Sequence, residues 1–250
     1  MIKQDFHIHS TFCDGKNTPE EMVLAAIGKG LKRMGICAHS PVAFDCEYYL
    51  PEHRFGEFQA EISRLREKYK AHIEVLCGIE LDIFSPVDTS GFDYIIGSVH
   101  YVQKDGEYFS VDDTPEKLAH GCSRLFGGDY LALARRYFEI AAQLVEKTNC
   151  DIIGHFDLLT IFNKGGCLLD ESAEEYSSAW KAAVDRLLPF GKPFEINTGG
   201  IARGYRSVPY PAPQIMDYIA SRGGKFVLSS DAHATENIAY GFDKYEHWCE

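Results

Sequence analysis

Short runs of apolar and β-branched residues alternate with longer amphipathic stretches along nearly the whole chain. The short runs predict seven strands, at residues 5–9, 33–39, 73–81, 94–100, 151–155, 194–197 and 225–230. The longer stretches predict helices, several of which open with proline or a capping residue, at residues 19–29, 54–69, 130–148, 173–188 and 213–221. Because strands and helices alternate, the pattern predicts an α/β fold in which helices surround a parallel sheet.

Two connections are longer than a compact barrel needs, at residues 41–53 and 102–128. Long loops in such folds are commonly functional, so we expect both to shape a substrate pocket. Neither has low complexity, and the sequence shows no internal repeat and no interdomain linker. Since 250 residues suffice for one α/β barrel, we predict a single domain over residues 1–250.

Composition narrows the range of functions. The 37 acidic and 25 basic side chains give a formal charge of -12, which repels phosphate polymers, so we predict no nucleic-acid partner. A small anionic substrate is still compatible, because divalent cations in one cleft reverse the local potential. No apolar run approaches the length of a signal or membrane segment, and the eight cysteines form no C-x-x-C pair. We therefore expect a cytoplasmic protein without membrane contact, whose oligomeric state the sequence does not define.

Histidine and acidic residues gather at the ends of the predicted strands. Six of the ten histidines lie there, namely His7, His9, His39, His100, His155 and His233. Glu80 ends the third strand, Asn197 ends the sixth, and Asp231 follows the seventh. In a parallel barrel these strand ends meet at one rim, where the active site lies. A single histidine at a strand end is more often a structural residue, but a set of this size predicts a cluster of divalent metals such as Zn, Mn or Fe.

The spacing of these residues suggests how they share ions. His7 and His9 are two residues apart on one strand, so they point to the same face and can hold one ion together. Glu80 is the natural bridging carboxylate, because its two oxygens can serve two ions. A neutral imidazole also needs a partner for its second nitrogen, and Asp5 and Asp157 are candidates for that role.

Seven short motifs follow one another along the chain: Asp5-Phe6-His7-Ile8-His9-Ser10, Asp14-Gly15, Ala38-His39-Ser40, Gly78-Ile79-Glu80, Gly97-Ser98-Val99-His100, Gly154-His155 and Ser230-Asp231-Ala232-His233. In this order they resemble the metal-binding motifs of the polymerase and histidinol phosphatase (PHP) superfamily. The resemblance implies a distorted (β/α)7 TIM-like barrel that binds three divalent metal ions. The implied ligand sets are His7, His9, Glu80 and Asp231 for the first ion, Glu80, His100 and His155 for the second, and Asp14, His39 and His233 for the third.

Three further segments are similar to histidinol-phosphatases within this superfamily. They are Asp14-Gly15-Lys16 with Thr18-Pro19-Glu20-Glu21, His39-Ser40-Pro41 with Tyr48-Tyr49, and Glu195-Ile196-Asn197-Thr198-Gly199-Gly200 followed by Arg203. The resemblance implies a phosphoric monoester hydrolase (EC 3.1.3.15) that converts L-histidinol phosphate to L-histidinol and phosphate in histidine biosynthesis. The sequence has no Cys-x5-Arg loop and no Asp-x-Asp motif, which favours attack by a metal-activated hydroxide over a covalent phosphoenzyme.

Catalytic and phosphate-binding candidates follow the last strands. Arg203 is the first candidate for a fork-like contact to phosphate, and Arg206 is the second. Asn197 orients substrate or a ligand, or else caps a turn. Asp231 and His233 are both candidates for protonating the leaving oxygen.

The long loops supply candidates for binding the imidazole and amino groups, namely Phe44, Asp45 and Tyr49. One alternative keeps the metals but acts on another small phosphomonoester or a nucleotide. A second is a non-catalytic metal-binding module, which predicts eroded ligands, whereas all nine positions here can coordinate. A third, a metal-dependent amide or lactone hydrolase, ranks last because Glu80 holds the bridging position that a lysine usually holds in such enzymes.

Overall fold

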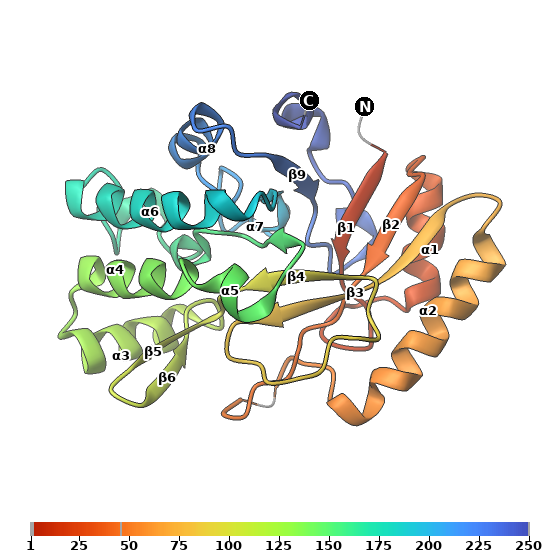
Figure 1. Ribbon diagram of the computed structural model, residues 1–250, viewed down its shortest axis with the longest axis horizontal. Helices are drawn as coiled ribbons and strands as arrows, with labels where there is room; N and C mark the ends of the chain where they lie inside the picture. Colours follow the sequence, from red (N-terminus) through yellow and green to blue (C-terminus); the bar gives the residue numbers. More distant parts are fainter. Residues whose placement is uncertain (1–2, 46, 250) are drawn as a thin grey trace.

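The computed structural model describes residues 3–45 and 47–249. Seven parallel strands curve into a nearly closed barrel in the order β1-β2-β3-β4-β7-β8-β9, which confirms the predicted fold class (Figure 1). Their bounds are Gln4–Ile8 (β1), Arg33–Ile36 (β2), Glu74–Asp82 (β3), Tyr94–Ser98 (β4), Ile152–Ile153 (β7), Phe194–Asn197 (β8) and Phe226–Ser229 (β9). Backbone hydrogen bonds of Ala232 with His7 and His9 join β1 to the chain that follows β9.

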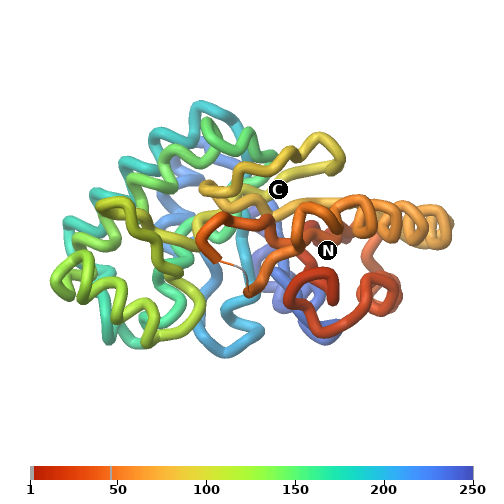
Figure 2. Tube along the Cα trace, turned by 90° about the horizontal axis from the view of Figure 1, so that it is seen from below, coloured from red at the N-terminus to blue at the C-terminus, as the bar shows by residue number. Residues whose placement is uncertain are grey.

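Helices cover the outside of this barrel. Their bounds are Pro19–Gly28 (α1), Phe55–Tyr69 (α2), Pro115–Phe126 (α3), Tyr130–Ala141 (α4), Leu144–Thr148 (α5), Glu174–Leu187 (α6), Gly199–Ala202 (α7) and Pro213–Ser221 (α8). One apolar layer lies under α1 and α2, and a larger one lies under α4, α6 and α8. Figures 1 and 2, at right angles to each other, both show these helix groups on opposite flanks of the barrel.

Short 3-10 turns complete the connections, at Glu52–Arg54, Leu158–Thr160, Lys164–Gly166, Leu188–Phe190, Thr235–Asn237, Phe242–Lys244 and Glu246–Trp248. Within residues 3–45 and 47–249, no helix combines the length and the apolarity needed to cross a lipid bilayer.

The structure adds to the prediction between residues 102 and 128, where the sequence analysis places a long loop and no strand or helix. An antiparallel hairpin forms there from β5 (Tyr101–Lys104) and β6 (Glu107–Ser110). Its turn is Asp105-Gly106, and both residues have positive φ, 53° and 82°. An Asp-Gly pair is a strong hairpin signal because this turn type needs left-handed backbone at both positions. The absence of strands from this part of the prediction is therefore wrong, although Ser110, Asp112 and Asp113 do line a cavity, as expected of this connection.

The same region also contains α3, which the sequence pattern does not predict. Its start has the chemistry of the start of α1: a threonine caps the helix and proline occupies the first turn. The Thr114 hydroxyl accepts a hydrogen bond from the backbone N–H of Lys117 at 3.1 Å, which satisfies one of the free donors at a helix start. Farther along, the predicted helix over 130–148 is two helices, α4 and α5, because Gln143 leaves helical backbone geometry.

Tyr94 fills the barrel interior towards the amino ends of the strands. Its buried hydroxyl donates a hydrogen bond to the carbonyl oxygen of Phe6 at 2.5 Å. A β-carbon on Gly35 or Gly78 would overlap the Tyr94 side chain, so only glycine leaves room for it on these two strands. The Tyr94 ring therefore fills the interior at this end of the barrel.

Candidate metal centre

The carboxyl ends of the strands bring the nine residues assigned to metal binding to one rim. They are His7, His9, Asp14, His39, Glu80, His100, His155, Asp231 and His233. Each lies in a strand or shortly after one, and Asp14 lies on the loop between β1 and α1. Seven of them line a cavity of about 790 Å³, while His7 and His9 are buried directly beneath it.

Glu80, at the end of β3, lies at the centre of the group and is 1% exposed. Its Oε2 lies 3.2 Å from His7 Nε2 and 3.4 Å from His9 Nε2. Asp231 approaches the same two imidazoles, with its Oδ1 at 3.7 Å from His7 Nε2 and 3.5 Å from His9 Nε2. Two imidazoles and two carboxylates thus converge on one point.

The other oxygen of Glu80 faces a second pair of imidazoles. Its Oε1 lies 3.1 Å from His100 Nε2 and 2.7 Å from His155 Nε2. Ser98 donates a hydrogen bond to the same oxygen at 2.7 Å, which fixes the carboxylate plane. Glu80 therefore presents one oxygen to each of two sets of histidines, the arrangement that a bridging carboxylate needs.

Asp14 is the acidic member of a third group. Its Oδ1 lies 3.6 Å from His39 Nε2, and its Oδ2 lies 3.1 Å from His233 Nε2. The rings of His39 and His233 stack against His9, with centroids 4.4 and 4.3 Å away. His9 is thus shared between this group and the one around Asp231, so the groups form one continuous cluster.

The donor atoms fit divalent metal ions. His7 Nε2, His9 Nε2 and Glu80 Oε2 are buried and have no hydrogen-bond partner, although such atoms are costly to leave unpaired. Ligand atoms about 2.1 Å from one ion lie roughly 3.0–3.5 Å apart in octahedral or tetrahedral geometry. The distances from Glu80 Oε2 to the two nitrogens, 3.2 and 3.4 Å, are in that range. The chain therefore carries a metal-binding cluster of histidine, aspartate and glutamate.

The pKa values of the histidines in this cluster differ. Burial alone would lower those of His7, His39 and His100, but the nearby carboxylates raise them, to about 10 for His100, so protons and metal ions compete for these rings. Burial, together with the neighbouring His233 and His39, lowers the pKa of His9 to about 3, so its imidazole is neutral. Burial alone would raise the pKa of Glu80, but the surrounding imidazoles hold it well below its usual range, so the carboxylate is ionised. Cys37 also lies close to His7 and His9, yet burial raises the pKa of its thiol, which keeps it protonated as an ordinary core residue.

Two carboxylates that the sequence analysis does not select bind the second nitrogens of histidines. Glu195 Oε1 lies 2.7 Å from His7 Nδ1. Asp82 Oδ2 lies 3.3 Å from His100 Nδ1 and accepts the His100 backbone N–H at 3.0 Å. Such partners fix the ring orientation of a metal-binding histidine.

Asp5 and Asp157, the carboxylates predicted for this role, lie elsewhere. Asp5 accepts hydrogen bonds from Ser230 and from backbone N–H groups, and Asp157 accepts one from the backbone of Ala212. Neither contacts an imidazole nitrogen of a described residue, so this part of the prediction is wrong. The available signal was Glu195 itself, a charged residue in a buried strand two positions before Asn197.

The two arginines have different surroundings. Arg203 lines the cavity, and its guanidinium donates to Asp231 Oδ2 at 3.0 Å and lies 2.9 Å from His233 Nδ1. Arg206 is buried over the Tyr210 ring, with Nη1 at 3.7 Å from Asp157, and is not among the residues that line this cavity.

The remaining substrate-binding candidates are divided between three locations. Tyr49 lines the cavity. Phe44 and Asp45 line an adjoining hollow of about 420 Å³ beside the β5–β6 hairpin, where the Tyr101 hydroxyl donates to Asp45 Oδ2 at 2.8 Å. Asn197 is fully buried beneath the rim and donates to Glu195 Oε2 at 3.0 Å. Only the first of these locations gives direct access to the cluster.

The charge of the cavity depends strongly on bound cations. Seven carboxylates line it, those of Asp14, Glu80, Asp82, Asp112, Asp113, Asp231 and Glu236, against two cationic side chains, Lys16 and Arg203. A phosphate dianion would be repelled by this lining alone, and divalent ions at the cluster would reverse the potential at that end. Metal binding and anion binding are therefore linked in this cavity.

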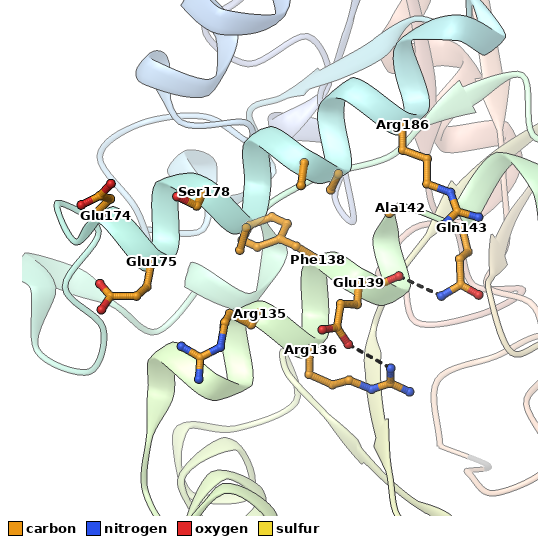
Figure 3. A pocket seen from close by; sticks show the side chains of 13 residues that line it. Arg135, Arg136, Phe138, Glu139, Ala142, Gln143, Glu174, Glu175, Ser178 and Arg186 are labelled. Atoms are coloured by element: carbon orange, nitrogen blue, oxygen red, sulfur yellow. Dashed lines mark hydrogen bonds and ion pairs between the residues drawn. The ribbon is translucent and has the colours of Figure 1, made fainter.

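A second hollow of similar size, about 840 Å³, lies between α4 and α6 on the outside of the barrel (Figure 3). Alanines and Phe138 form its floor, and arginine and glutamate side chains, among them Arg135 and Glu175, lie at its edges. It contains no histidine or cysteine, and no carboxylate in it belongs to a cluster of metal-binding donors. The chemistry therefore belongs to the rim and not to this groove.

Residues 5–199 match the PHP domain, and the chain belongs to the PHP domain family. Within this family it is similar to a protein of Deinococcus radiodurans named probable histidinol-phosphatase, with 29% identity over 95% of this chain and 89% of that protein. A Schizosaccharomyces pombe protein of the same name is 26% identical over 94% of this chain and 82% of its own length.

Two solved structures share the fold. A candidate histidinol phosphatase, hisK, of Listeria monocytogenes aligns with a TM-score of 0.85 and 21% identity, over 97% of this chain and all of that chain. The Lactococcus lactis histidinol phosphate phosphatase, solved as a complex with Zn, L-histidinol and phosphate, aligns with a TM-score of 0.68 and 22% identity over 93% of this chain and 87% of its own. At these identities the likeness establishes the barrel.

Proposed function

We propose that this protein is a histidinol-phosphatase that hydrolyses L-histidinol phosphate to L-histidinol and inorganic phosphate. The observation that carries the proposal is the cluster of histidine and carboxylate donors at the base of a cavity of about 790 Å³. Its support is that relatives matching over nearly the whole chain are named for this activity.

Three divalent ions, of Zn, Mn or Fe, are part of this proposal. The proposed ligand sets are His7, His9, Glu80 and Asp231, then Glu80, His100 and His155, then Asp14, His39 and His233. When bound, such ions neutralise phosphoryl oxygens and lower the pKa of water. The chain's contribution is to hold these donors on strands that pack rigidly against one another.

Arg203 is the proposed phosphate-binding residue. Its guanidinium lines the cavity and has a rigid fork of N–H donors, of which three already point at the Asp231 carbonyl, the Asp231 carboxylate and His233 Nδ1. The remaining donors are available for phosphate oxygens on the cavity side. Arg206 and Asn197 would then act from beneath the rim and not by contact with substrate.

Asp231 is the better of the two candidates for moving a proton to the leaving oxygen. Both ring nitrogens of His233 are engaged, Nε2 facing Asp14 at 3.1 Å and Nδ1 lying 2.9 Å from Arg203. Asp231 has one oxygen held by Arg203 and a second that faces the cluster. Burial alone would raise the pKa of Asp231, but Arg203 and the neighbouring histidines hold it below its usual range, so the side chain is a carboxylate and can give the departing alkoxide only a proton that it has first taken from the attacking water.

The wall of the cavity that contains Asp112 suits the cationic part of this substrate. The backbone N–H of Val111 donates to the carbonyl of His100 at 2.9 Å, which holds Asp112 beside the cluster. Asp112 accepts one hydrogen bond from Ser110 at 2.8 Å, and within the described ranges no cationic side chain pairs with it. In L-histidinol phosphate the ammonium is on the carbon next to the ester carbon, so phosphate at the cluster puts a cation near this wall. We assign Asp112 to the ammonium.

Aromatic side chains complete this wall. Tyr49 lines the same cavity, and Tyr101 lies between it and the adjoining hollow that contains Phe44 and Asp45. Tyr49 is the proposed contact for the imidazole, with Phe44 and Asp45 supporting Tyr101 from behind. A flat heteroaromatic ring packs well on such side chains.

A cytoplasmic location and a single domain over residues 1–250 also belong to this proposal. The described cysteines are all unpaired, as in a reducing compartment. The net charge of -12 argues against nucleic acid as a substrate.

The test is release of inorganic phosphate by the metal-loaded protein from L-histidinol phosphate, beside a panel of other phosphomonoesters and nucleotides. His9→Ala serves as the control. A kcat/KM for L-histidinol phosphate far above the panel, and abolished in the control, supports the proposal. Activity on another ester alone would keep the metal chemistry and reject the substrate, and inactivity on every ester would favour a binding module.

A further inference from the structure

Strand β8 carries two polar residues into the interior of the barrel, directly beneath the cluster. Glu195 and Asn197 are two positions apart, so both point to the same face, and both are 0% exposed. A buried carboxylate is costly unless its lone pairs are satisfied, which makes its donors informative.

Every donor to Glu195 belongs to the cluster or touches it. Its Oε1 lies 2.7 Å from His7 Nδ1. Its Oε2 accepts the backbone N–H of His155 at 2.9 Å and the Asn197 amide at 3.0 Å. The same amide lies 3.4 Å from Asp231 Oδ2. One carboxylate thus connects residues from three separate strand ends, β1, β7 and β9.

The contact to His7 decides which nitrogen of that ring is free. A carboxylate only accepts hydrogen bonds, so His7 must carry a proton on Nδ1. In the neutral ring Nε2 then has its lone pair exposed, and this is the atom that faces Glu80 Oε2 at 3.2 Å without a hydrogen-bond partner.

We propose that Glu195 is a positioning residue that sets the His7 tautomer. Through the His155 backbone and Asn197 it also holds the first two ligand sets in their positions relative to each other. This inference rests on the metal sites of the proposed function and is independent of the substrate.

Replacement by the isosteric amide in Glu195→Gln separates this role from simple packing. If the new NH2 group faced the Oε2 side, it would meet two donors, the His155 N–H and the Asn197 amide. Asn197 cannot turn to accept, because its Oδ1 already accepts the Gly199 N–H at 2.9 Å. The NH2 group therefore faces His7, whose ring must accept on Nδ1 and move its proton to Nε2. That tautomer satisfies all hydrogen bonds but removes the lone pair that would bind metal.

The experiment measures Zn²⁺ binding to the whole protein after the metal has been stripped, by competition with a chromophoric chelator. We expect Glu195→Gln to bind Zn²⁺ roughly 10–100-fold more weakly, while the metal-free variant unfolds within about 3 °C of the metal-free wild type. Because Glu195, Glu80 and Asp231 raise the pKa of the buried His7 ring well above its usual range, the tautomer is read in the Zn²⁺-loaded wild type, where imidazole ¹⁵N shifts should show a proton on His7 Nδ1 and none on Nε2.

Asp157→Asn is the matched control, because Asp157 is an equally buried carboxylate that contacts the Ala212 backbone and no imidazole nitrogen. It should leave Zn²⁺ affinity unchanged, whatever it does to stability. Unchanged Zn²⁺ affinity in Glu195→Gln, or an equal loss in Asp157→Asn, would overturn the proposal. If Glu195→Gln does not fold, the ¹⁵N spectrum of the Zn²⁺-loaded wild type decides alone, since a His7 ring without a proton on Nδ1 excludes the proposed tautomer. None of these readouts depends on which ester the enzyme hydrolyses.

Discussion

Asp112 gives the most direct test of how this cavity selects its substrate. It stands on the loop between β6 and α3, half-buried, next to the backbone of His100. In Asp112→Asn the side chain keeps its size and its contact with Ser110 but loses its charge. The ammonium of L-histidinol phosphate would then lose an ionic partner while the phosphate keeps all of its own.

The size of the effect follows from the surroundings of this carboxylate. A hydrogen bond to a charged group contributes about 1.5–3 kcal/mol. Because Asp112 is half-buried and solvent screens it, the lower value applies, about 1.5 kcal/mol. Since each 1.36 kcal/mol corresponds to about tenfold in rate, we expect kcat/KM for L-histidinol phosphate to fall roughly tenfold.

The assay compares two substrates and two variants. L-histidinol phosphate is measured beside a phosphate ester of similar size without the amine, for which Asp112→Asn should leave kcat/KM unchanged. Asp113→Asn is the matched control, because Asp113 lines the same cavity but is already paired with Lys117 and Tyr48. Equal losses on both substrates would refute the reasoning, since they would mean that Asp112 supports the metal centre or the fold.

Three further outcomes follow from the geometry. Asp82→Asn should weaken Zn²⁺ binding roughly 10–100-fold in the chelator competition, because Asp82 holds the His100 ring and its backbone N–H; wild-type affinity would contradict this. Gly78→Ala should lower the free energy of unfolding in urea by about 2 kcal/mol, because its β-carbon would overlap Tyr94; a loss below about 0.5 kcal/mol would show that the ring can move aside. Stripping the metal should lower the unfolding temperature by roughly 5–10 °C relative to protein in Zn²⁺ at 100 times its Kd, and added Zn²⁺ should restore it. An unfolding temperature that is the same with and without chelator would argue against metal binding at the cluster.

Much of the fold could be predicted because each βα unit carries its own local signal. The strands are short and buried on both faces, and helix starts such as Thr18-Pro19 have explicit capping chemistry. The β5–β6 hairpin was harder, because its strands are half exposed and polar and lack an apolar run. There the turn pair Asp105-Gly106 was the better signal.

The candidate site was also predictable only in part: the positions of its residues were, and their side-chain contacts were not. Strand ends of a parallel barrel meet at one rim, so the positions of residues such as His39 and Glu80 follow from sequence order alone. Which carboxylate meets which ring nitrogen depends on side-chain direction inside the barrel, and sequence spacing does not contain that information. Glu195 and Asp82 were missed for this reason. Asp112 was missed because its position depends on the hairpin.

The closure of the barrel has a consequence for how the enzyme matures. The cluster combines His7 and His9 from the first strand with Asp231 from the chain after the last, and the two ends are held together by hydrogen bonds such as that from the Ser230 backbone to Asp5, 225 residues apart. A ribosome makes the first two ligands more than 220 residues before the carboxylate that completes their set. A nascent chain therefore cannot offer this cluster in its final geometry until Asp231 has been synthesised and the strand before it has closed the barrel.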